Sequence, residues 1–200
     1  MIRKWQIRTI GAAAVTAAAA ACADGAAAST GTDPCGNTVT YVQPFLRWLD
    51  PDTYVAVPGG SFENTAPAFA LAGGAKIVGG NEPWSMGGKS LSLPAGASAL
   101  SPAMCVGVFY PTIRMFATNS GSPASALRVD VLYTSKSGVT SSLLAGRFYA
   151  NGTWQPSPIL TFLSSAFGQL NGIYVNFKLT VEGSGNWKVD DLLVDPVKHR

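Results

Sequence analysis

The sequence predicts an all-β protein, an antiparallel two-sheet β-sandwich closed by one disulfide. Charged residues make up only 12% of the chain, whereas 22 Gly and 13 Pro accompany many Ser, Thr and Val residues, which favours strands and turns over helices. Beyond residue 23, short apolar or alternating runs are separated by turn residues at a spacing typical of a β-sandwich. No stretch there keeps a period of 3.6 residues, so long amphipathic helices are not expected.

The first 23 residues have the pattern of an export signal. Residues 1–8 carry three basic side chains and no acid, residues 9–21 are uncharged and rich in alanine, and Ala21-Cys22-Ala23 has the small-residue form that signal peptidase recognises. We expect cleavage near Ala23 and a secreted protein. The apolar run is shorter than the ~20 residues of a membrane-spanning helix, so the mature chain is expected to lack a transmembrane segment. Lipid attachment at Cys22 is the alternative.

After the signal, we expect a flexible arm over residues 24–36 and a single β-sandwich domain over residues 37–200. A mature chain of about 177 residues is an ordinary size for one domain. Cleavage near Ala23 leaves two cysteines, Cys35 and Cys105, and an even number in an exported chain predicts a disulfide. Two separate buried thiols are the alternative.

The expected elements follow in chain order. An edge strand is expected over residues 39–42, then a helical turn over residues 45–49 that ends before Pro51, then a strand over residues 54–57. Gly73-Gly74 interrupts an apolar run and predicts a hairpin over residues 68–78. The almost continuously apolar residues 104–110 predict a central strand. Further strands are expected over residues 89–93, 112–118, 127–134, 142–150 and 159–163.

The clearest strand is Ile173–Glu182, in which apolar and polar side chains alternate from end to end. A period of two residues means that one face is buried and the other is solvated. Turn residues follow at positions 183–186, and residues 187–194 resume the strand pattern. The last two strands are therefore expected to form an antiparallel hairpin.

The charge balance argues against two classes of partner. Three of the 14 Lys and Arg residues lie in the export signal, which contains none of the 11 acids, so the expected mature chain has no net charge. Binding to nucleic acid or to an anionic membrane needs a clustered basic surface, so neither partner is expected. We expect a monomer.

Two short motifs suggest a family. Gly59-Gly60-Ser61-Phe62-Glu63 and the segment from Trp187 to Val194 (WKVDDLLV) resemble the two ends of a galactose-binding-type jelly roll, a superfamily that includes many carbohydrate-binding modules. The segments SLSLP at residues 90–94 and WQPS at residues 154–157 also resemble uncharacterised exported proteins of high-GC Gram-positive bacteria. The resemblance spans residues 59–196 and implies a jelly-roll fold; its motifs are short, so it bears more on fold than on ligand.

The same resemblance implies a structural Ca²⁺, held where the two ends of the jelly roll lie side by side. Carried over to this chain, Glu63 and Asp190 would be ligands, with Asp191 as a further candidate. Carboxylates and backbone carbonyls of a glycine-rich turn are suitable Ca²⁺ ligands. In a regular strand Asp190 and Asp191 face opposite sides, so only one would point toward Glu63 unless a bulge intervenes. The alternative is a pair of solvated acids, or Asp190 bonded to backbone amides.

Signals of catalysis are nearly absent from the sequence, and no catalytic residue is predicted. The chain has one histidine, His199, next to its end, which argues against a Ser-His-Asp triad, a Cys-His pair or a histidine zinc site. No nucleophile-elbow or phosphate-binding motif is present. Carboxylates could hydrolyse a glycoside, with Glu63, Glu82, Asp130 and Glu182 as candidates, but no spacing pairs them.

Aromatic and polar residues supply the candidate ligand site. Sugar rings stack on flat aromatic faces, and polar groups fix their hydroxyls. Trp84 and Trp154 lie in loops with polar neighbours, and Arg114, Arg128 and Tyr174 alternate with apolar residues on their strands. We expect these three to share one open sheet face. The alternative is that the tryptophans plug the core and the arginines solvate the sheet. Two other tryptophans are expected in the core: Trp48 and Trp187.

Three functions follow from these observations. The leading hypothesis is an exported, non-catalytic binding module for a glycan or another cell-envelope component, whose fold the implied Ca²⁺ would help to stabilise. The first alternative is a structural or protein-interaction module of the cell surface, which predicts an exposed apolar patch or a free strand edge. The second is a carboxylate-dependent, glycoside-active enzyme, which requires two of the candidate acids in one cleft.

Overall fold

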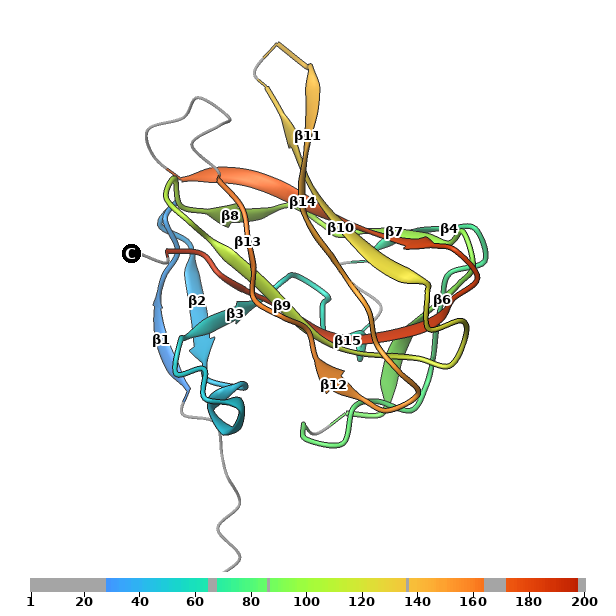
Figure 1. Cartoon of the computed structure of the whole chain (residues 1–200). Helices are drawn as coiled ribbons and strands as arrows, with labels where there is room; N and C mark the ends of the chain where they lie inside the picture. Colours follow the sequence, from blue (N-terminus) through green and yellow to red (C-terminus); the bar gives the residue numbers. More distant parts are fainter. Residues whose placement is uncertain (1–27, 65–67, 86, 136, 164–171, 198–200) are drawn as a thin grey trace, which may run out of the picture.

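The computed structural model describes residues 28–64, 68–85, 87–135, 137–163 and 172–197. The predicted export signal and His199 lie outside these residues. The described part is all-β, as predicted: two antiparallel sheets pack face to face, with one short 3₁₀ turn, η1 (Leu46–Trp48), where the helical turn was expected (Figure 1). No helix in this part of the chain is long and apolar enough to cross a lipid bilayer.

The larger sheet is organised around the last strand, β15 (Asn186–Asp195). Along one edge, β15 pairs first with β6 (Lys89–Pro94) and then with β3 (Tyr54–Ala56); along its other edge it pairs with β9 (Thr112–Asn119). The remaining strands extend this sheet outward: β1 (Ser29–Thr32), β2 (Thr38–Val42), β5 (Lys76–Gly79), β12 (Gln155–Pro156) and β13 (Leu160–Thr161).

The smaller sheet is centred on β14 (Ile173–Glu182). Its strands run in the order β11 (Thr140–Phe148), β10 (Ala126–Thr134), β14, β7 (Ser98–Leu100) and β4 (Ala70–Ala72), and β8 (Met104–Val106) pairs with the start of β14. The alternation predicted for β14 is confirmed. Its odd-numbered residues all lie in the main hydrophobic core, which fills the space between the two sheets.

Both predicted hairpins, the one at Gly73-Gly74 and the one between the last two strands, are wrong. The strands on either side of Gly73-Gly74 do not pair with each other, because β4 joins β7 in the smaller sheet and β5 joins β6 in the larger one. Likewise β14 and β15 belong to different sheets. The two glycines have φ values of +67° and +85°, a region that glycine enters without strain, and this allows the chain to turn the corner between the sheets. Alternation shows which face of a strand is buried, but not which neighbour it pairs with.

Two further expectations also need correction. Part of the predicted flexible arm, Ser29–Thr32, forms β1, which covers the outer side of β2, so β2 is not an edge strand. The expected central strand over residues 104–110 is only the three-residue β8.

The predicted disulfide is confirmed. Cys35 lies just before β2 and Cys105 lies on β8, with their Cα atoms 6.1 Å apart and a separation of 70 positions in sequence. The bond therefore joins the N-terminal end of the larger sheet to the smaller sheet. A loop of this length gives a chain-entropy stabilisation of about 4 kcal/mol in the simplest model.

Candidate functional site

A second, smaller hydrophobic cluster lies on the outer face of the larger sheet. Ile113, Met115 and Ala117 of β9 point into the main core, whereas Phe116 points the other way. Phe116 packs there with buried side chains of three other segments: Phe45, Tyr54 and Leu193. The chain between β2 and β3, which includes η1, covers this part of the sheet.

Three tryptophans gather around Phe116. The ring centroids of Trp48 and Trp84 lie 5.4 and 5.2 Å from that of Phe116, and 4.8 Å from each other in an edge-to-face arrangement. Trp154 packs against the same cluster, since β12 pairs with β9 beside Phe116. Trp84 is 36% exposed and the other two are half-buried. We call Trp48, Trp84 and Trp154, resting on Phe116, the aromatic surface.

The aromatic surface joins the two loop tryptophans that the sequence singled out. It also corrects one expectation, because Trp48 is half-buried at this surface and does not lie in the main core, whereas Trp187 is fully buried there as expected. Trp48 was missed because an aromatic residue within a short apolar run looks like a core residue. The sequence feature that could have indicated a surface position for Trp48 was the charged residue beside it, Arg47.

Arg47 lies over the aromatic surface. Its side chain is exposed, and its guanidinium carbon is 5.1 Å from the ring centroid of Trp48 and 5.7 Å from that of Trp84, within cation–π range. None of the ion pairs found in the described part of the chain involves Arg47. Its N–H groups are therefore available to hydrogen-bond a ligand that reaches the tryptophans.

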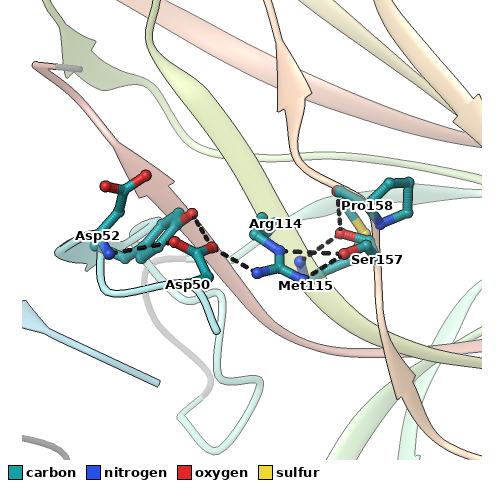
Figure 2. A network of polar contacts seen from close by, with 7 residues as sticks. Asp50, Asp52, Arg114, Met115, Ser157 and Pro158 are labelled. Carbon is teal, nitrogen blue, oxygen red and sulfur yellow. Dashed lines mark hydrogen bonds and ion pairs between the residues drawn. The ribbon is translucent and has the colours of Figure 1, made fainter. Parts of the chain in front are cut away.

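Arg114 was expected on an open sheet face, and this is wrong: it is 6% exposed and forms the floor beneath Phe45. Its Nη1 donates to Asp50 Oδ2, and its Nε and Nη2 donate to the carbonyl oxygen of Ser157 over 3.1 and 2.8 Å (Figure 2). The guanidinium carbon lies 4.1 Å from the Phe45 ring centroid. The side chain of Arg114 does point away from the main core, as the alternation predicted. The outer face of the sheet is covered at this position by the chain between β2 and β3, so Arg114 is buried there.

Asp50 is the buried partner that balances the charge of Arg114. Its Oδ2 also accepts a hydrogen bond of 2.7 Å from the Tyr54 hydroxyl. Burial alone would raise the pKa of Asp50, but hydrogen bonds from Tyr54 and Arg114, together with the positive charge of Arg114, hold it below its usual value. Burial and the neighbouring Asp50 raise the pKa of Tyr54. The network therefore keeps a fixed ion pair under the aromatic rings.

Arg128 and Tyr174 lie elsewhere, on the outer face of the smaller sheet. Arg128 donates two hydrogen bonds of 2.7 Å to Asp130, and Tyr174, which is 53% exposed, accepts a hydrogen bond from Asn37. Arg128 pairs with Thr180, six residues along β14 from Tyr174, a separation of about 20 Å along a strand. Contrary to the expectation, Arg114, Arg128 and Tyr174 therefore do not share one open sheet face. A role for Arg128 or Tyr174 alone in binding stays a prediction.

The implied cation site lies next to the aromatic surface. Asp190 of β15 is opposite Phe116 of β9 and is 2% exposed. The two ends of the domain do meet there: Val57 N donates to Leu192 O over 2.9 Å, and Leu192 N donates to Gly60 O over 3.0 Å. The pairing of β15 with β9 is irregular between positions 190 and 193, and Asp191 has a φ of +45°. A bulge therefore lies at this position, which is the condition under which both aspartates could point toward the same side of the strand.

Glu82, which the sequence did not place among the cation ligands, is the central acid of this region. It is fully buried; its backbone N–H donates to Asp190 Oδ2 over 3.2 Å, and its Oε2 accepts a hydrogen bond from Trp84 N. Its Oε1 has no hydrogen-bond partner among the described residues. The sequence shows only an acid in a loop, and burial of that acid comes from the packing of distant segments.

The charges of four acids act on one another here, and we call Glu63, Glu82, Asp190 and Asp191 the acidic cluster. Burial, and then the negative charges of Asp191 and Glu82, raise the pKa of Asp190 to about 7. Burial raises the pKa of Asp191, and Glu82 and Glu63 add to the effect. Glu63 accepts hydrogen bonds of 2.8 Å from the amides of Gly88 and Lys89, which lower its pKa.

A buried carboxylate oxygen without a donor, beside two acids of raised pKa, is an environment that a bound cation would stabilise. Within the described residues, the acidic cluster does not bring three ligand oxygens within 4.8 Å of one another. A Ca²⁺ ion there would draw further ligands from backbone carbonyls and water, as Ca²⁺ commonly does. Among the residues that the structure describes, the group that meets this distance is Asp33, Cys35 and Cys105, and the two sulfurs are already joined in the disulfide.

Two solved structures share the fold. One contains the N-terminal CBM22-1 and GH10 modules of Clostridium thermocellum endo-1,4-beta-D-xylanase 10B in complex with xylohexaose, at 12% identity and a TM-score of 0.52; the match covers 72% of this chain and 29% of that one. The other is the enzymatically active domain of tailspike protein 4 of bacteriophage CBA120, at 14% identity and a TM-score of 0.50, covering 71% and 21%. This chain thus spans less than a third of either. Likeness at such low identity concerns the fold alone.

Comparison with protein-family models and with curated proteins finds no match.

Two other features of the described structure could form a site: the remaining candidate acids and one cavity. Asp130 and Glu182 lie on the smaller sheet and bond to Arg128 and Arg147, far in the fold from the acidic cluster. A cavity of about 540 Å³ lies between β4, β5 and the turn at residues 59–64. Its lining is mainly apolar: Phe62, Phe69, Leu71 and Ile77, with Asn64 and Lys89.

Proposed function

We propose that this protein is an exported, non-catalytic module that binds glycans through the aromatic surface. The observation that carries the proposal is the convergence of Trp48, Trp84 and Trp154, from three separate segments, on Phe116 at the outer face of a sheet. Indole rings provide the flat apolar faces on which sugar rings stack. The buried ion pair of Arg114 and Asp50 lies beneath Phe45, which in turn packs against Trp48 and Phe116, so the surface is preformed for binding.

Arg47 supplies the polar contact that such a site needs. Its exposed guanidinium lies over Trp48 and Trp84 and carries five N–H donors, so it can hydrogen-bond sugar hydroxyls or a uronate carboxylate beside the stacked ring. Few polar groups are needed, because the apolar faces supply most of the contact area and the polar groups fix orientation.

Export is part of the same proposal. A disulfide between Cys35 and Cys105 forms and persists in an oxidising environment, which supports a location outside the cytoplasm. The amino-terminal pattern up to Ala23 predicts an export signal that would direct the chain out of the cytoplasm.

The test measures binding by titration calorimetry, with xylohexaose as the first probe and a panel of neutral and acidic polysaccharides after it. Substitution of Trp84 or Trp154 by Ala should weaken binding of the responding glycan by about 5- to 30-fold each, the equivalent of 1–2 kcal/mol for an aromatic contact. Tyr174→Ala, which removes an exposed aromatic on the other sheet, distinguishes the aromatic surface from a binding role of Tyr174, and the proposed site predicts normal binding for this variant. Unchanged binding by Trp84→Ala and Trp154→Ala, or loss of binding in Tyr174→Ala, contradicts the proposed site; no binding to any glycan contradicts the function.

A structural Ca²⁺ at the acidic cluster is a separate part of the proposal. Glu82 and Asp190 would be its principal ligands, with Asp191 and Glu63 nearby. Because Ca²⁺ binds only the folded protein, an excess of about 100 times its dissociation constant should stabilise the fold by about 2.7 kcal/mol. Thermal unfolding with CaCl₂ and with a chelator measures this, and equal melting temperatures would contradict a Ca²⁺ site. Asp190→Asn should abolish the difference.

A further inference from the structure

We propose that the glycans bound at the aromatic surface are acidic ones, polysaccharides whose uronate carboxylates are recognised by Arg47 and by two lysines further along the same sheet face. The inference rests on the proposed function and names its ligand class. It depends on a row of polar side chains that continues from the aromatic surface across the outer face of the larger sheet.

The register of four strands defines this row. Lys188 of β15 pairs with Thr118 of β9 on one side and with Ser92 of β6 on the other. Ser92 pairs in turn with Lys76 of β5. The first three residues each have a sequence neighbour in the main core, so their side chains point to the outer face, and the fourth shares the face of its partner. We call these four residues the polar row.

The polar row begins beside the aromatic surface. Thr118 is two residues from Phe116 on β9 and therefore lies on the same face. Its hydroxyl donates to the carbonyl oxygen of Asn151 over 3.1 Å, in the loop that leads to Trp154. From Thr118 the row crosses three strand spacings to Lys76, a distance of about 14 Å. A ligand chain that stacks on the tryptophans can therefore continue over the row at right angles to the strands.

Both lysines of the polar row carry charges that a ligand can reach. Lys76 is exposed and Lys188 is half-buried, and their backbones lie about 10 Å apart on either side of Ser92. Neither lysine takes part in any of the ion pairs found in the described part of the chain. Together with Arg47, they give this face three cations for the charges of an anionic chain.

The nearest acids are less accessible than these cations. Glu82 and Asp190 are 0% and 2% exposed, so a ligand on the outer face does not contact their carboxylates. Asp50 is paired with Arg114 beneath the rings, so these two residues add no net charge. Arg47 and the two lysines are therefore the charged groups on the ligand's path, and they favour an anionic ligand over a neutral one.

Arg47 is suited to a carboxylate in particular. Its guanidinium is held over Trp48 and Trp84 by cation–π contacts, which restrict its position without using its N–H groups. The planar fork of N–H donors matches the two oxygens of a carboxylate, and such a charge-assisted hydrogen bond is about twice as strong as one to a neutral hydroxyl. A uronic acid carries its carboxylate at the edge of the sugar ring, so the ring can stack on an indole while the carboxylate pairs with Arg47.

Titration calorimetry of the full-length protein with ligands that differ only in charge tests the inference. The probes are hexagalacturonate and hexamannuronate, each compared with its methyl ester. At least one acid should bind about 10-fold more tightly than its ester. This advantage should shrink as NaCl is raised from about 50 to about 500 mM, because salt screens exposed charges. Binding of the neutral xylohexaose should depend little on salt.

Three substitutions locate the contacts. Arg47→Gln should weaken binding of the preferred uronide by about 10-fold, and Lys188→Gln and Lys76→Gln by about 2- to 5-fold each, with little effect on the methyl ester. Lys178→Gln, which removes a cation from the outer face of the smaller sheet, is the matched control and should bind normally. The disaccharide of the same uronide should be insensitive to Lys76→Gln, because it is too short to reach from the aromatic surface to β5.

The outcomes separate this inference from the proposed function. If acids and esters bind equally well and Trp84→Ala weakens both, the glycan site stands and the selectivity for acids is wrong. If the acid is preferred but Arg47→Gln and both lysine variants bind it normally, its charge is recognised elsewhere and the inference is overturned. If no glycan binds, neutral or acidic, the proposed function itself fails. Unchanged melting temperatures of the variants show that any loss of binding comes from the lost contact.

Discussion

Replacement of Asp50 by Asn tests whether the buried ion pair supports the outer face of the larger sheet. The side chains of Arg114 and Asp50 are 7% and 5% exposed, so the substitution leaves a guanidinium buried without its counter-charge. Loss of one partner of such a pair costs about 3–5 kcal/mol. For a domain of this size, each kcal/mol lowers the melting temperature by about 2–4 °C, so a decrease of roughly 6–20 °C is expected.

Thermal and urea unfolding followed by circular dichroism measure this change. The matched control is Glu182→Gln, which disrupts an exposed arginine–carboxylate pair with Arg147 and should leave the melting temperature nearly unchanged. A double variant that replaces Asp50 and Arg114 with apolar residues of similar volume should recover much of the loss, since no buried charge then remains. A decrease below about 1 kcal/mol for Asp50→Asn would refute the reasoning, because it would mean that water reaches Arg114.

Three other predictions use the same unfolding assays. The pKa of Asp50 is lower in the folded than in the unfolded protein, so its contribution is complete above about pH 4 and is lost as the pH falls through the folded value; the wild type should therefore lose more stability on acidification than Asp50→Asn does. Cys35→Ser should lower the stability by about 4 kcal/mol, and an unchanged melting temperature would mean that the disulfide is absent in solution. Gly60→Ala places a Cβ 2.7 Å from the carbonyl oxygen of Leu192 and should cost about 1–3 kcal/mol, whereas Gly152→Ala, which meets no atom within 4 Å, should be neutral.

Much of the fold could be predicted because the local pattern and the tertiary environment agree. β14 begins and ends where the alternation of Ile173–Glu182 begins and ends, since one side of it faces the core along its whole length. The disulfide followed from the two cysteines, of three in the chain, that lie beyond the predicted export signal. The pairing of strands did not follow, because β4, β5 and β15 alternate in the same way whether they join the nearest strand in sequence or cross to the other sheet.

The candidate site was predictable only in part. Trp84 and Trp154 stood out as aromatic residues in polar loops, and the structure brings both to Phe116. Arg114 has the alternation of an outward residue, but no local pattern shows that the chain between β2 and β3 folds back over it. Glu82 is hidden for the same reason, since its burial depends on Asp190, more than a hundred residues further along the chain.

The position of β15 has a consequence for the order in which the domain can assemble. β3, β6 and β9 do not pair with one another in the described structure, and each of them pairs with β15. The larger sheet therefore cannot close until residues 186–195 have left the ribosome, and the pairings that join its parts through β15 connect distant segments of the chain. Such topologies fold slowly. A polypeptide with this topology therefore stays open until the strand β15 is available to pair.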